Sequence, residues 1–281
     1  MTASGADGAV ARGASRGETI TLEAPAARAP DRGTYRALRV GTILAVLAIW
    51  EALTRAHAVP AVFLPSLDAV AAELVRLAHT GDLWRSTGAS LGRIGAGFVL
   101  GGAAGLIVGV LAGISPRAEA VADPLIAAVY PIPKIALLPL LILWLGIGEA
   151  PKIVLIAVGA FFPVVIGTAA AIRDVDPLLI RAARSFGADR IQIVTKVQLP
   201  AAVPAVFASL RLAAGMSLLL VVSAEMIAAT AGIGYLILYA GDLMQTSRLL
   251  AGIVVLSILG LLSTAGLAAL ERRLFRGRAR R

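Results

Sequence analysis

The chain contains no cysteine, and only three lysines and two histidines among its 281 residues. The lack of cysteine excludes disulfides, zinc-thiolate sites and thiol catalysis. His57 and His79 do not have the spacing of a metal site. None of the lysines, Lys134, Lys152 and Lys196, follows a glycine, so the phosphate-binding loop G-x-x-x-x-G-K-[ST] is absent. The chain therefore cannot hydrolyse ATP by that mechanism.

Charged residues are also scarce, at 15%, whereas hydrophobic residues make up 58% of the chain. This composition is too apolar for an ordinary soluble domain. The formal net charge of +9 raises nucleic acid as a partner. However, the basic residues lie in clusters between apolar runs, a pattern that favours the anionic inner leaflet of a membrane. We therefore expect an integral membrane protein that contacts lipid and binds no nucleic acid.

Six apolar segments reach the length of about 20 residues that a membrane-spanning helix needs. They cover residues 37–54, 87–113, 122–146, 151–172, 202–229 and 249–271. The apolar runs are continuous rather than alternating, which argues against membrane β-strands. The first run, followed by Ala56-His57-Ala58, also resembles a signal peptide, but its length and the later spans favour a transmembrane helix. The predicted fold is an all-α polytopic membrane protein whose six-helix domain covers residues 37–271.

Lysine and arginine are distributed unevenly between the two sides of these spans. Eighteen lie on the side of the termini, whereas the other side holds only Arg55, Arg76, Arg85 and Arg248. The positive-inside rule therefore predicts that both termini are cytoplasmic. Residues 1–36 are rich in Ala, Gly and Arg, and we expect them to form a disordered tail. Residues 272–281 are expected to form a basic cytoplasmic tail.

Residues 176–200 form a charged cytoplasmic segment between the fourth and fifth spans. Asp176-Pro177 predicts the start of a helix, and Gly187 predicts its end at a residue with positive φ. The apolar face of this helix is formed by Leu178, Leu179, Ala182, Ala183 and Phe186. A second short helix is expected at about 189–197, with Pro200 closing the unit. Three interpretations fit: an amphipathic loop on lipid headgroups, a DNA-reading helix-turn-helix, or a docking element for a cytoplasmic protein.

Small residues and prolines mark two of the spans. Gly97, Gly101, Gly105, Gly109 and Gly113 recur every four residues along the second span. This spacing predicts a ridge for close helix packing rather than a ligand site.

In the third span, Pro131, Pro133 and Pro139 are expected to interrupt the helix. Carbonyls freed at membrane depth are tolerated where protein or a water-filled cavity covers them. Pro131 and Pro133 are therefore candidates for the translocation path, with a plain structural kink as the alternative.

Ionisable residues inside spans mark a pathway or a pair. Lys134, Arg211 and Glu225 are candidates for the path or for gating, with snorkelling to the interface as the alternative. Arg211 and Glu225 lie fourteen residues apart, about 21 Å along a helix, so they cannot pair within one subunit. Glu225 is expected near the outer end of the fifth span and Arg211 nearer the inner end.

The segment at 181–200 reads R-A-A-x-x-x-G, nine residues, then V-x-L-P. It resembles the EAA loop of binding-protein-dependent ABC importers. Arg181 stands where that family usually has Glu, and Val197 where it usually has Ile. The resemblance implies a coupling helix that inserts into a groove of the ATPase subunit. The docking residues that it implies are Arg181, Ala182, Ala183, Ser185, Phe186, Gly187, Ala188, Leu199 and Pro200.

Three longer stretches extend the resemblance. They are YPIPKIALLPLLILWLGIGEAPKI (130–153), AFFPVVIGTAAAIRDVDPLL (160–179) and AEMIAATAGIGYLI (224–237), and they resemble the nitrate, sulfonate, taurine and bicarbonate group of importer permeases. The resemblance implies a type I ABC importer permease fold in the bacterial inner membrane. It also implies a second permease copy, two ATPase subunits that bind the ATP, and an extracytoplasmic substrate-binding protein. No catalytic residue, metal or cofactor of its own is expected.

Two other classes of protein remain as alternatives. An ion-coupled secondary transporter predicts an internal repeat between the two halves of the chain, and no convincing repeat is found. A membrane-embedded enzyme needs polar groups that converge on one site, and the chain is poor in them.

Overall fold

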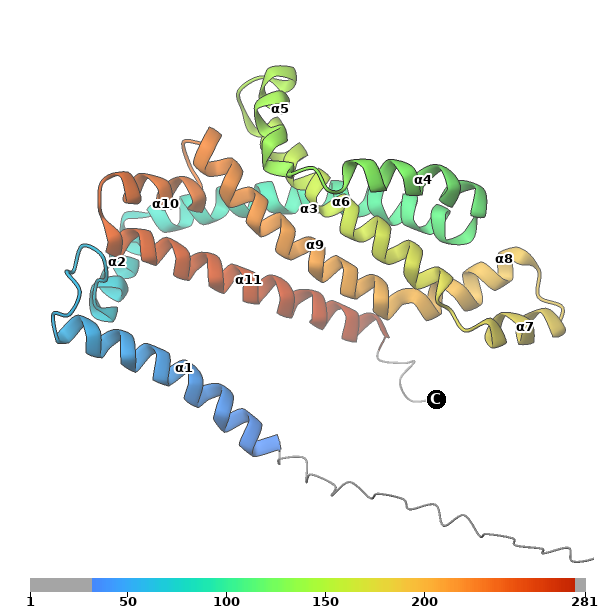
Figure 1. Cartoon of the computed structure of the whole chain (residues 1–281), viewed down its shortest axis with the longest axis horizontal. Helices are drawn as coiled ribbons and strands as arrows, with labels where there is room; N and C mark the ends of the chain where they lie inside the picture. The colour runs from blue at the N-terminus through green and yellow to red at the C-terminus, as the bar shows by residue number, and fades with distance from the viewer. Residues whose placement is uncertain (1–31, 276–281) are drawn as a thin grey trace, which may run out of the picture. The chain divides into compact units, whose positions relative to one another are not determined.

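The structure is a computed structural model that describes residues 32–275 (Figure 1). Within this range every regular element is helical, as predicted for an all-α protein. The chain divides into two compact units, residues 1–49 and 50–281. Of the first unit, the structure describes the larger part of α1 (Arg32–Arg55), a helix of 24 residues that covers the first predicted span. The predicted tail at 1–36 lies mostly outside the described residues, although α1 already begins at Arg32.

Four helical stretches of the described chain are long and apolar enough to span a membrane. They are α3 (Asp82–Ile114), α6 (Glu149–Arg173), residues 190–228 and α11 (Thr246–Phe275). Residues 190–228 comprise α8 (Arg190–Ile193), the π-helix η2 (Val194–Gln198) and α9 (Leu199–Ala228). These stretches agree with four of the predicted spans. That α1 also crosses the membrane remains a prediction.

The third predicted span is broken. α4 (Pro116–Val129) is followed, after a bend of 86°, by η1 (Lys134–Leu137) and α5 (Leu138–Leu145), and a fifth span results if these are joined. Pro131 and Pro133 lie in the break, because proline lacks the N–H and disfavours helical conformation in the residue before it. The predicted interruption is confirmed there. Pro139 instead lies in the first turn of α5, where a missing N–H costs little.

The core of the second unit is the packing of α3 against α6. Each glycine of the predicted ridge faces α6, and a Cβ atom built on Gly101 would lie 2.0 Å from the Ala157 carbonyl oxygen. No side chain fits in that space, so the two backbones are in direct contact. The prediction that these glycines serve helix packing is confirmed.

Two short helices lie at one end of the second unit. α2 (Leu67–Thr80), α10 (Ile233–Asp242) and α11 share a hydrophobic cluster formed by Val70, Leu77, Leu236 and Ala251. The opposite end carries α7 (Pro177–Ser185) and α8 (Figure 1). The long helices α3, α9 and α11 run between these two ends. Candidate functional sites lie at both ends.

Candidate functional sites at the two ends of the unit

The predicted docking segment begins with α7. A side-chain oxygen of Asp176 accepts a hydrogen bond from the Leu178 N–H at 2.8 Å, which caps the first turn. The helix ends just before Gly187, whose φ is +80°, and the Ala188 N–H donates to the Ala183 carbonyl at 3.0 Å. These are the hydrogen bonds of a glycine-terminated helix. Both predicted boundaries of this helix are confirmed.

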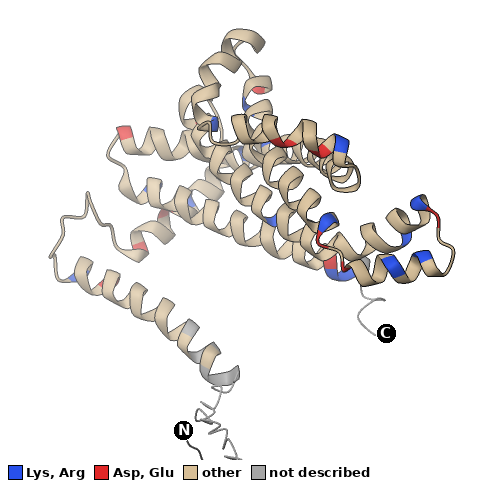
Figure 2. Ribbon diagram, turned by 45° about the vertical axis from the view of Figure 1, so that its right-hand side comes forward, with Lys and Arg blue, Asp and Glu red and all other residues tan. Residues whose placement is uncertain are grey.

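The apolar face of α7 is uncovered in the single chain. Leu178, Leu179 and Phe186 are exposed, and Phe186 retains 91% of its accessible surface. Arg181 and Arg184 are exposed beside them, and Figure 2 shows the concentration of Lys and Arg on α7 and α8. An exposed aromatic side chain with basic neighbours is typical of a protein-binding surface rather than of a solvated loop.

Not every residue of the predicted docking set is free for a partner. The Ser185 hydroxyl donates to the Arg181 carbonyl at 3.2 Å, so it satisfies the helix backbone. Leu199 packs on the hydrophobic cluster of Ala171, Ile172 and Ala202. Pro200 lies in the first turn of α9 and is half-buried.

The second predicted helix of the segment begins as expected but does not end as expected. Asp189 and Gln192 form a reciprocal capping box at 2.8 and 3.2 Å. Pro200 does not close the unit, because α8, η2 and α9 form one continuous helix. The Leu199 N–H donates to the Val194 carbonyl, five residues back, and this wider π-helical turn accommodates the proline that follows it.

Two of the predicted path residues, Lys134 and Arg211, already interact with other residues of the same chain. The Lys134 ammonium lies 4.6 Å from the Tyr130 ring centroid and 5.1 Å from that of Phe162, and it donates to the Tyr130 carbonyl. Arg211 forms an ion pair with Glu271 of α11. The structure therefore holds each cation by a nearby partner, and their role in a path remains a prediction.

Glu225, the third candidate, belongs to a buried charge network. Its side chain is 0% exposed, so the snorkelling alternative is wrong for this residue. The Arg93 Nη1 atom lies 2.7 Å from Glu225 Oε1, and its other nitrogens bind Glu149 at 2.5 and 2.8 Å. The Lys152 Nζ atom lies 2.8 Å from Glu149. Two cations and two anions thus neutralise each other; Arg93, Lys152 and Glu225 are buried, whereas Glu149 reaches the surface.

The same network fixes the loop between α9 and α10. Glu225 accepts hydrogen bonds from the Ser90 hydroxyl and from the Gly234 N–H, the latter at 2.9 Å. Arg93 donates to the Ala231 carbonyl at 2.7 Å. A Cβ atom on Gly232, whose φ is +130°, would lie 2.3 Å from the Glu225 carboxyl carbon. The loop can therefore approach the buried carboxylate only through glycine.

The sequence interpretation missed the partners of Glu225. Arg93 and Lys152 lie within predicted spans but were not singled out, and Glu149 was placed in a connection. The signal was the presence of opposite charges in different apolar segments, since buried charges must pair. Which segments meet could not be inferred, because Arg93 and Glu225 are 132 residues apart in the chain.

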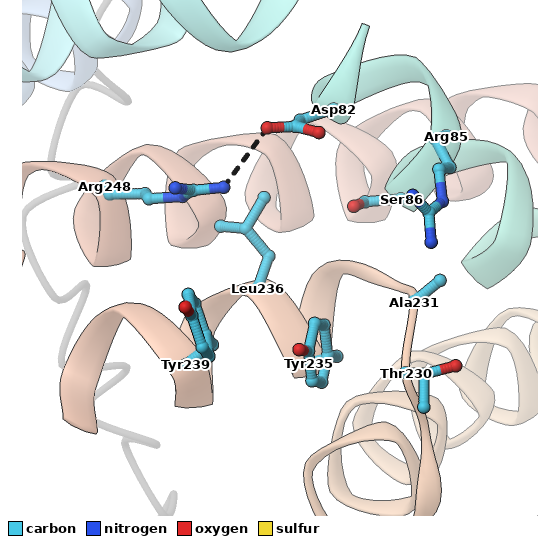
Figure 3. Close-up of a pocket in the computed structure, with 9 residues that line it drawn as sticks. All are labelled: Asp82, Arg85, Ser86, Thr230, Ala231, Tyr235, Leu236, Tyr239 and Arg248. Carbon is cyan, nitrogen blue, oxygen red and sulfur yellow. Dashed lines mark hydrogen bonds and ion pairs between the residues drawn. The ribbon is translucent and has the colours of Figure 1, made fainter. Parts of the chain in front are cut away.

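A pocket opens beside this network, at the end of the second unit that carries α10 (Figure 3). Its volume is about 280 Å³. It is lined by Asp82, Arg85, Ser86, Thr230, Ala231, Tyr235, Leu236, Tyr239 and Arg248. Ala231 belongs to both features, since its carbonyl accepts the hydrogen bond from Arg93. The pocket therefore rests directly on the loop that the buried charges hold.

Residues 103–276 match the family model described as "Binding-protein-dependent transport system inner membrane component". The chain is 37% identical over 242 residues to the taurine transport system permease protein TauC of Escherichia coli (strain K12), covering 84% of this chain and 88% of the relative. It is 38% identical over 233 residues to the putative aliphatic sulfonates transport permease protein SsuC of Bacillus subtilis (strain 168), covering 83% and 84%.

Solved structures show the same fold. The methionine ABC transporter MetNI, in inward-facing conformations, aligns with a TM-score of 0.55 at 25% identity, over 66% of this chain and 92% of that one. An amino acid ABC transporter aligns with a TM-score of 0.53 at 19% identity, over 72% and 97%. The family model and the two named relatives are permease components of transport systems, so the alternative of an ion-coupled secondary transporter is not supported. The predicted resemblance is confirmed: the chain belongs to the family of inner-membrane components of binding-protein-dependent ABC transport systems.

Proposed function

We propose that this chain is the permease subunit of an ATP-driven importer of small organic sulfonates, such as taurine or alkanesulfonates. The observation that carries the substrate class is the similarity to TauC and SsuC, each over more than four fifths of this chain. Among the anions that the sequence resemblance allowed, sulfonates are the class that these two relatives share by name. The permease itself forms and breaks no covalent bond, and it binds no metal or cofactor.

The α7 surface is the docking site for the ATPase. Support comes from its uncovered apolar face, with Phe186 91% exposed, and from the absence of a phosphate-binding loop in the sequence. The ATP site therefore belongs to another chain, and that chain binds at α7. In this arrangement the α7 end is cytoplasmic, both termini are cytoplasmic, and the opposite end receives the extracytoplasmic substrate-binding protein.

The continuous helix of residues 190–228 connects the docking segment to the buried charge network. It contains 39 residues, which corresponds to about 58 Å. A displacement of α8 by the ATPase is therefore transmitted along one helix to Glu225, which lies in its last turn. We infer that this helix couples ATP-driven closure to rearrangement of the loop at residues 229–232, in an alternating-access cycle.

Two copies of the permease enclose the path in this proposal, with one ATPase bound to each. In the single chain a groove of about 630 Å³ opens between α6 and α9, lined mainly by small apolar side chains such as Ala170, Ala205 and Ala208. Two-fold symmetric homodimers are the commonest assembly. Covering this surface with a second copy removes it from lipid and gives the path a second wall.

Affinity purification from native membranes in mild detergent, followed by mass spectrometry, tests the docking site. The wild-type chain is expected to bring down an ATPase, and Gly187→Trp to lose it while remaining in the membrane. Gly146→Trp is the matched control, because the two glycines have φ of +78° and +80° and no atom within 4 Å of an added Cβ. Equal recovery of the ATPase with both variants would place the docking site elsewhere.

A further inference from the structure

Arg85 differs from the other basic residues that were predicted to lie outside the membrane. Arg55 pairs with Glu51 at 2.7 Å, Arg76 with Glu73 at 2.5 Å, and Arg248 with Asp82 at 3.3 Å. The Arg85 side chain has neither an ion pair nor a hydrogen bond within the described part of the chain, although its backbone N–H donates to the Gly81 carbonyl. The positive-inside rule disfavours arginine on this side, so an unpaired arginine in a pocket there calls for a ligand of opposite charge.

The pocket around Arg85 presents hydrogen-bond donors from three helices and one loop. Arg85 and Ser86 come from α3, and Thr230 comes from the loop between α9 and α10. Tyr235 and Tyr239 come from α10, and Arg248 comes from α11 (Figure 3). Guanidinium groups bind acidic oxygens through several N–H donors at once. Hydroxyl groups can donate to the same oxygens. Donors of both kinds therefore converge on one pocket.

Arg248 provides a second unsatisfied donor. Its Nε atom is buried and has no hydrogen-bond partner among the described residues. A buried donor without an acceptor is costly, and its presence beside a cavity indicates that an acceptor binds there. Among the described residues, Asp82 is the only acidic side chain that lines the pocket, and its carboxylate lies 3.3 Å from the Nη2 atom of Arg248. Two arginines against one aspartate leave the lining with one excess positive charge.

The size and the walls of the pocket fit a small organic anion. Its volume of about 280 Å³ lies just below the range of about 300–1,000 Å³ for ligand pockets, as suits a ligand of few atoms. The Tyr235 and Tyr239 rings stack with centroids 5.8 Å apart, and Leu236 lies between them in sequence. These side chains supply an apolar wall for a short alkyl chain beside the charged donors.

We propose that this pocket is a substrate site, in which Arg85, together with the free Nε–H of Arg248, binds the sulfonate group of the imported molecule. The assignment of sulfonate as the ligand rests on the proposed function. A sulfonate carries one negative charge on three acceptor oxygens and no donor, which matches a lining that is rich in donors and positive. Because the pocket borders the loop held by Arg93 and Glu225, bound substrate lies next to the element that the long helix moves.

Ligand-observed saturation-transfer NMR with the purified permease–ATPase complex in detergent, without the binding protein, tests this site. The probe is ethanesulfonate, and ethyl methyl sulfone is its uncharged analogue. Wild type is expected to bind ethanesulfonate and not the sulfone. Arg85→Gln is expected to weaken binding by about tenfold or more, as for loss of a charge-assisted hydrogen bond. Arg85→Lys keeps the charge and is expected to retain part of the affinity.

Arg76→Gln is the matched control, because it removes the same charge from the same side of the membrane without lining this pocket. It is expected to bind ethanesulfonate like wild type. Arg85 is exposed, so its replacement leaves the fold intact, and Tyr235→Phe provides a second test through loss of one hydroxyl. Equal binding by wild type and Arg85→Gln, absence of binding by wild type, or equal binding of the sulfone would overturn the proposal.

Three further outcomes separate this site from its alternatives. If Arg85→Gln abolishes stimulation of the ATPase by the binding protein but leaves ethanesulfonate binding unchanged, Arg85 docks the binding protein, and the proposal is wrong. If the complex binds ethanesulfonate at Arg85 but imports a different anion and no sulfonate, the anion site stands and the substrate in the proposed function is wrong. If sulfonates are imported equally by wild type and Arg85→Gln, only the pocket assignment fails.

Discussion

At the α7 end of the second unit, charged and aromatic side chains are exposed, whereas at the α10 end the principal charges are buried. Phe186 retains 91% of its surface, and Glu225 retains none. The hydrogen bonds that shape α7 join residues within five positions of each other, as in the Asp176 cap. The bonds that join Glu225 and Arg93 to each other, to Ser90 and to Glu149 connect residues 56 to 135 positions apart. One end is therefore shaped by local sequence, and the other by tertiary packing around a neutralised charge cluster.

The largest effect on stability is expected from Arg93→Met. It leaves the fully buried Glu225 without its cation and Glu149 without one of its two cations, and breaking a buried pair from one side costs about 3–5 kcal/mol. Thermal unfolding of the purified protein in detergent measures the loss. The double variant Arg93→Met/Glu225→Leu is expected to recover part of it, because no carboxylate then remains fully buried. A single variant as stable as wild type would show that the network does not hold this end together.

A smaller loss is expected from Gly101→Ala at the contact between α3 and α6. The added Cβ atom would lie 2.0 Å from the Ala157 carbonyl oxygen, and overpacking of this kind costs about 1–3 kcal/mol. Gly95→Ala on the same helix is the control, because nothing lies within 4 Å of its added Cβ. Unfolding temperatures of the two variants should differ, with Gly95→Ala at or above wild type. Identical values would mean that the helices separate readily at Gly101.

No effect on stability is expected from Phe186→Ala, although it removes a large side chain. That side chain contacts little in the single chain, so its truncation should leave the unfolding temperature unchanged while weakening recovery of the ATPase. Loss of an interface anchor costs about 2 kcal/mol or more. Ile147→Ala is the control, since Ile147 is 92% exposed and lies in the α5–α6 connection. Destabilisation by Phe186→Ala, with the ATPase still bound, would contradict the docking role.

The same contrast explains what could be predicted from the sequence. The helical ends at Asp176 and Gly187 depend on the chemistry of single residues, and both predictions are confirmed. The glycine ridge of α3 follows from a spacing of four, and its packing role is also confirmed. The continuation of the helix through Pro200 was not predicted, because a proline disfavours helix locally and the π-helical turn that accommodates it is not visible in composition or periodicity.

The site at the α10 end could not be predicted from the sequence, for a different reason. Glu225 stood out as a charge in an apolar segment, but its pairing with Arg93 depends on which helices are neighbours. Arg85 looked like one of four ordinary connection residues until the structure showed that Arg55, Arg76 and Arg248 are paired. A residue without a partner cannot be recognised before the partners of the others are known.

The most direct test of the account is uptake of radiolabelled taurine by proteoliposomes that contain this permease and its ATPase, with the binding protein added outside. Uptake is expected to require internal ATP and the binding protein, and to be lost with Gly187→Trp but not with Gly146→Trp. Uptake that proceeds without ATP, or that follows an imposed ion gradient, would contradict the central claim that this chain is driven through its α7 surface by a separate ATPase.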